Sequence, residues 1–180
     1  AVEIVGIFEL NNVFGLRSRE LSFLQKDGTV VTLDGFNVDS GGEALVLNVN
    51  GLTIETEIVA PKIVINTTGD IVQAPTGRFV TNQLVLIGTG NFDLNALNQI
   101  GTALVPGLVA IDVVGDVSLT NEFSIMFDMI VCGDDTFAGA TVIPNGAAAD
   151  GDLTLTVVNG DVTQANDSIF EVIGLMTFDV

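Results

Sequence analysis

Apolar and polar residues alternate in short segments along most of the chain, and a glycine precedes many of these segments. The phrase Gly-Asp-apolar recurs at Gly69, Gly115, Gly151 and Gly160 and, in looser forms, at Gly35, Gly51 and Gly90. Alternation with a period of two is typical of a β-strand that buries one face, and glycine is typical of the tight turn before it. The pattern therefore predicts short strands, each with one buried face, joined by turns.

Repetition of this unit predicts that the units stack on one another, because a single turn and strand cannot bury its own apolar face. The strands expected in the first half of the chain span residues 29–33, 35–39, 44–49, 52–59, 62–65, 70–73, 78–87 and 91–94. The spacing between glycine-led phrases is irregular, which indicates insertions at the corners. We predict an all-β fold, a right-handed parallel β-helix (β-solenoid) with coils of variable length.

The turn residues also permit a second fold. Asp-Gly occurs at 27–28 and 34–35, and Asn-Gly occurs at 50–51. These dipeptides favour two-residue hairpins, which join antiparallel strands. An antiparallel β-sandwich or jelly roll is therefore the alternative to the β-helix.

The composition suggests one domain with two distinct regions. Residues 1–27 contain three of the five basic residues, and we expect an N-terminal cap or a segment that pairs with a partner. Residues 28–180 are expected to form the β-solenoid domain. A loop insertion is expected at 121–150, with an apolar first part that forms a strand and an exposed tail at 144–149.

The charge of the chain is strongly negative and unevenly distributed. The formal net charge is −18, and no basic residue follows Arg78. Binding to nucleic acid is disfavoured, because neutralising phosphates requires lysine and arginine. Membrane insertion is not expected either, because the longest uncharged run, 94–111, is interrupted by polar residues, glycine and proline.

The residue types present exclude several kinds of catalytic site. The chain has no histidine and one cysteine, Cys132, which we expect to be a small buried apolar residue. Serine and cysteine hydrolase triads and the usual zinc sites are therefore excluded. Tryptophan and tyrosine, which form sugar-binding platforms, are also absent. We predict that the chain is not an enzyme, with a polysaccharide-acting β-helix enzyme as a remaining alternative.

Two sets of residues are candidates for binding or modification. Carboxylates at Asp134, Asp135, Asp150 and Asp152 lie at the two ends of the expected insertion and are hard oxygen ligands that suit calcium. No other cofactor is expected, and solvated turn residues are the simpler interpretation of these acids. Asn66 and Asn166 each begin an Asn-x-Ser/Thr sequence and are candidate glycosylation sites or plain turn residues.

Several segments resemble the filamentous haemagglutinin-like secreted proteins, which include adhesins and two-partner secretion exoproteins. The resemblance rests on INTTGDIVQA with GRFVTNQLVL, on GTGNFDLNALNQIGT, and on VAIDVVGDVSLT, and it extends over about residues 60–165. It implies a right-handed parallel β-helix without catalytic residues. It also implies an extracellular or cell-surface location and a role as a structural segment of an adhesin or fibre. A calcium-binding or carbohydrate-binding β-helix module is the alternative function.

The ends of the chain suggest its partners. The chain begins at Ala1 without methionine, as a processed or excised segment would. Residues 175–180 still alternate like a strand, which leaves a strand edge to be covered. We expect this edge to contact copies of the same protein or a continuing parent chain, through end-to-end assembly. Host or cell-surface glycans are further possible partners.

Overall fold

The computed structural model describes the backbone of residues 2–4, 9–11, 20–25, 31–34, 36–37, 44–130, 136–137, 140–141 and 146–180, and the side chains of residues 44–130 and 146–180. The strands are β1 (Val2–Ile4), β2 (Glu9–Asn11), β3 (Glu20–Gln25), β4 (Val31–Asp34), β5 (Phe36–Asn37), β6 (Ala44–Val49), β7 (Leu52–Ile54), β8 (Glu57–Val59), β9 (Lys62–Thr67), β10 (Ile71–Gln73), β11 (Arg78–Thr81), β12 (Gln83–Gly88), β13 (Phe92–Ile100), β14 (Gly107–Val113), β15 (Val117–Phe127), β16 (Thr136–Phe137), β17 (Ala140–Thr141), β18 (Gly146–Ala149), β19 (Leu153–Gln164), β20 (Ile169–Val172) and β21 (Met176–Asp179). These residues include no helix, and therefore no helix that could cross a membrane.

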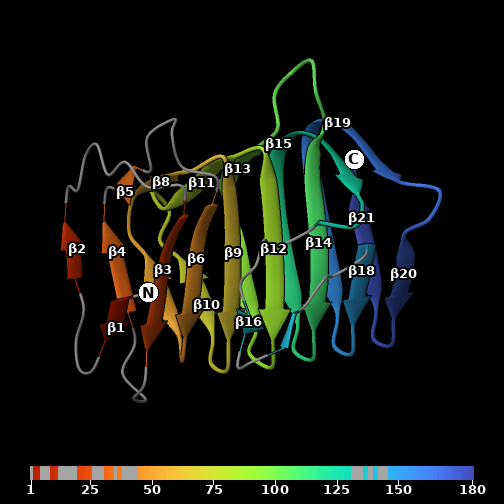
Figure 1. Cartoon of the computed structure of the whole chain (residues 1–180). Helices are drawn as coiled ribbons and strands as arrows, with labels where there is room; N and C mark the ends of the chain where they lie inside the picture. The colour runs from red at the N-terminus through yellow and green to blue at the C-terminus, as the bar shows by residue number, and fades with distance from the viewer. Residues whose placement is uncertain are drawn as a thin grey trace.

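Parallel ladders run the length of the molecule (Figure 1). The first ladder joins β1, β3, β6, β9, β12, β14, β18 and β20 in that order. The second joins β2, β4, β7, β10, β13, β15, β19 and β21. A third begins with β5, β8 and β11 and continues through the later parts of β13, β15 and β19. The chain passes through the ladders in the same order each time, and one such passage is one coil.

The expectation of an all-β fold with parallel strands is confirmed, and the antiparallel sandwich is wrong. In the described part of the chain, the only antiparallel strand pair is β16 with β17. The hairpin-favouring dipeptide Asn50-Gly51 lies between β6 and β7, which belong to different ladders. Gly51 has a φ of 154°, so the dipeptide makes a corner between ladders instead of a hairpin.

Coil length varies while the pairing register is kept. In the first ladder Leu47 pairs with Ile65, Ile65 with Leu86, Leu86 with Ile111, Ile111 with Ala147 and Ala147 with Phe170, so successive coils contain 18, 21, 25, 36 and 23 residues. The extra residues lie in the connections between ladder strands. Insertions are tolerated there because they do not alter which residues pair inside the ladders.

The interior is one continuous apolar column. Its members come from each ladder in turn, and the largest fully buried side chains include Phe79, Phe92, Phe127, Leu45, Leu47, Leu52, Ile54, Ile58, Ile63 and Ile65. Inward positions alternate with more exposed ones in the second ladder, as in β13 and β19. These strands therefore follow the predicted pattern of one buried face.

The first ladder departs from that prediction in β6, β9, β12 and β14, which are buried on both faces. Outward residues Val46, Val64, Val85 and Ala110 form a second apolar cluster that includes Ile130. Parallel strands covered on both sides carry continuous apolar runs. This explains why β6, β9 and β12 read ALVLNV, KIVINT and QLVLIG instead of alternating.

The longest coil contains an excursion of the chain between Phe127 and Gly146. β15 remains in the ladders as far as Phe127, which pairs with Gln164, and β18 re-enters the first ladder at Gly146. The tail expected as exposed loop is therefore wrong for residues 146–149, since Ala147 and Ala149 are buried in β18. Alanine fits there because the column needs a small side chain, and Gly146 adopts a φ of 86°.

Stacked glycines explain the recurring Gly-Asp phrase. Gly69, Gly90, Gly115, Gly151 and Gly174 lie above one another at the corner before the second ladder. A Cβ atom on Gly90 would lie 1.9 Å from the carbonyl oxygen of Gly69, and a Cβ on Gly115 would lie 2.4 Å from that of Gly90. Only glycine lets the backbones of successive coils approach this closely.

We predict that Gly90→Ala destabilises the fold by about 1–3 kcal/mol, because the new methyl group collides with backbone that cannot rotate away. The measurement is urea unfolding followed by circular dichroism. Thr89→Ala, at the exposed neighbouring position, is the control and should change the free energy of unfolding by less than about 0.5 kcal/mol. Equal stability of the two variants would contradict the close stacking of the glycine corner.

Candidate functional site

A ladder of Asp and Asn side chains follows the glycine corner. The Oδ1 atom of each residue accepts a hydrogen bond from a backbone N–H of the next coil. The distances are 3.1 Å from Asn91 N to Asp70, 2.9 Å from Asp116 N to Asn91, 2.8 Å from Asp152 N to Asp116 and 2.7 Å from Leu175 N to Asp152. The second residue of the phrase thus connects coils, and Leu175 ends the series because its side chain has no acceptor.

The Gly160-Asp161 phrase occupies a different corner. Gly160 lies within β19, and the Asp161 N–H donates to Ser124 Oγ at 3.0 Å. The Gly-Asp dipeptide therefore occurs at two different corners of the coil. The sequence pattern alone does not distinguish these two corners.

A shallow polar hollow of about 270 Å³ lies beside the Asp/Asn corner. Its polar lining consists of Asn91, Asp93, Asp116, Ser118, Asp152 and Thr154. Three of these side chains already take part in the corner ladder. The hollow is open to solvent.

Two of the four predicted calcium ligands, Asp150 and Asp152, lie among the described residues. Asp134 and Asp135 lie outside the described residues. Asp150 is exposed, and Asp152 belongs to the corner ladder. Among the residues that are described, no group of three or more His, Cys, Asp or Glu side chains is placed to hold a metal ion. Calcium binding stays a prediction.

The two candidate glycosylation sites differ in their surroundings. Asn66 is half-buried on β9, and its Nδ2 donates to Asn48 Oδ1 at 3.1 Å. Asn166 is exposed in the turn between β19 and β20. Asn166 is the more accessible of the two amides, and modification of either one stays a prediction. Cys132 lies outside the described residues.

Two buried asparagines fill the bend where the second ladder passes into the third. Asn98 and Asn121 are fully buried and occupy paired positions on β13 and β15. Asn98 Nδ2 donates to the carbonyls of Leu94, Ala96 and Thr120, and its Oδ1 accepts from Phe79 N at 2.8 Å. Asn121 Oδ1 accepts from Ile100 N at 2.8 Å. These amides satisfy backbone groups that the bend removes from the ladders.

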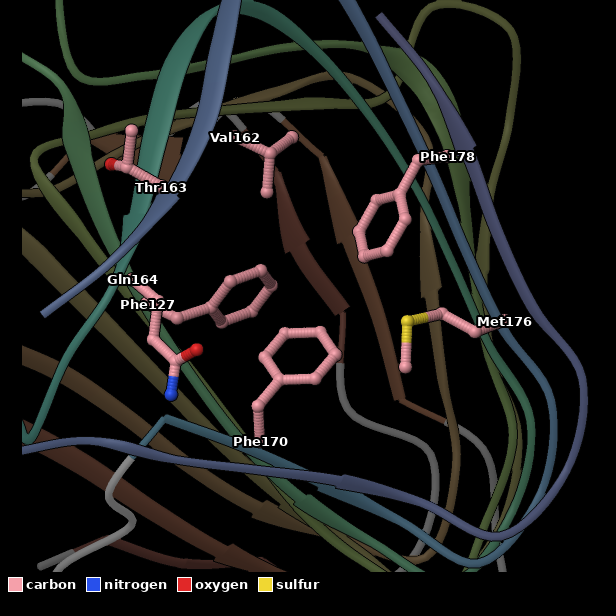
Figure 2. Close-up of a pocket in the computed structure, with 7 residues that line it drawn as sticks. All are labelled: Phe127, Val162, Thr163, Gln164, Phe170, Met176 and Phe178. Atoms are coloured by element: carbon pink, nitrogen blue, oxygen red, sulfur yellow. The ribbon is translucent and has the colours of Figure 1, made fainter.

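The end of the column formed by β20 and β21 exposes its apolar interior. Figure 2 shows Phe127, Phe170 and Phe178 around a hollow of about 270 Å³, with Met176 beside them. The rings of Phe127 and Phe170 lie edge to face with their centroids 5.1 Å apart, and Phe170 and Phe178 are 6.0 Å apart. Val162, Thr163 and Gln164 complete the lining.

Sequence reasoning predicted a strand within residues 175–180, where β21 lies, but missed the aromatic cluster and the buried amides. Phe127 and Phe170 are 43 positions apart, and only the parallel register brings them together. Asn98 and Asn121 carried no sequence signal beyond their polarity, because their burial depends on the bend.

Comparisons with known proteins returned no match: no family model, no curated protein and no solved structure matches this chain. The site must therefore be interpreted from its own geometry.

We predict that Asp116→Ala lowers the free energy of unfolding by about 1 kcal/mol, because the Asp152 N–H loses its acceptor. Asp116→Asn keeps the amide oxygen, as Asn91 does one coil earlier, and should retain nearly all of the stability. Thermal and urea unfolding of the two variants provide the comparison. A loss of equal size in both would show that charge, and not the hydrogen bond, matters at this corner.

We predict that Asn98→Asp costs about 3–5 kcal/mol at neutral pH, because a buried carboxylate would face three carbonyl oxygens. The pKa of the introduced carboxyl is raised above its unfolded value of about 3.9 in the folded state. Protonation therefore relieves the penalty: the deficit relative to the parent should shrink as pH falls through the raised folded pKa and stop changing below the unfolded pKa. Asn82→Asp, on the surface, is the control. A deficit that does not change with pH would overturn this account.

Proposed function

We propose that this chain is a non-enzymatic structural segment of an extracellular adhesin or fibre, built as a right-handed β-solenoid. The observation that carries the proposal is that two parallel ladders continue through all eight described coils around a filled apolar interior. Such a column holds its outer faces in fixed relation along its length. It is suited to act as a spacer or display surface.

The contacts that the polar side chains make support a structural role. Asp70, Asn91, Asp116 and Asp152 bind the backbone of neighbouring coils, and Asn98 and Asn121 fill a bend. Arg78, the last basic residue of the chain, forms an ion pair with Glu57 at 2.5 Å on the third ladder. In a polysaccharide-acting enzyme such polar and charged side chains would face the substrate, whereas here they bind other groups of the same chain.

The composition and the family resemblance support the handedness and the location. The segments that resemble filamentous haemagglutinin-like proteins coincide with β9 to the first part of β15 and with β19, which are ladder strands. The net charge of −18 keeps such an apolar chain soluble through self-repulsion. At about 4.8 Å per strand, eight coils span about 34 Å, and longer chains of this kind extend in proportion.

Immunogold labelling and fractionation of the source cells test the proposed location and role. We expect the protein at the cell surface or in the medium, and rod-shaped particles in negative stain. Incubation with a panel of polysaccharides should release no fragments. Label confined to the cell interior, or cleavage of a polysaccharide, would contradict the proposal. Saturable binding of calcium or a glycan by calorimetry would favour the alternative of a ligand-binding module.

A further inference from the structure

We draw no further inference here: the strongest candidate, the loop at residues 101–106 between β13 and β14, whose tip exposes Leu104 and Val105, carries nothing, because nothing in the structure shows what covers these two side chains.

Discussion

The structure depends on parallel backbone hydrogen bonding between successive coils, in a register that does not slip. Each coil can bury its apolar residues only if its strands lie directly over those of the previous coil. In six of the eight described coils, seven residues separate the first-ladder column from the second, including the first and the last. In these six coils, differences in coil length are therefore confined to the other connections. This is why a coil of 36 residues stacks on one of 25.

The corner between the first and second ladders helps to keep successive coils in this register. Glycine permits the backbones to meet, and the following Asp or Asn accepts a hydrogen bond from the coil above it. The bend toward the third ladder uses Asn98 and Asn121 for the same purpose in the interior, where no water is needed to satisfy the backbone. The polar side chains at these two places therefore hold backbone groups of neighbouring coils.

The acidity and the apolar content of the chain act on different parts of the surface. Repulsion among carboxylates opposes association of copies of the chain. Apolar side chains, in contrast, are exposed around Phe170 and Phe178.

The sequence by itself determined the local units. The short strands and the glycine corners could be predicted because they depend on residue type and short spacing, and the lack of histidine excludes sites that need it. The repetition of the units also favoured parallel pairing, but it did not exclude antiparallel pairing, since Asn50-Gly51 suits a hairpin as well as a corner. Only the tertiary structure decided that β6, β9, β12 and β14 are buried on both faces, because their outward apolar residues are covered by residues distant in the chain. It likewise decided that Ala147 and Ala149 belong to the column and that Phe127 meets Phe170. These outcomes depend on which coil lies over which, and stacking over 18 to 36 residues is a property of the assembled column that no local pattern encodes.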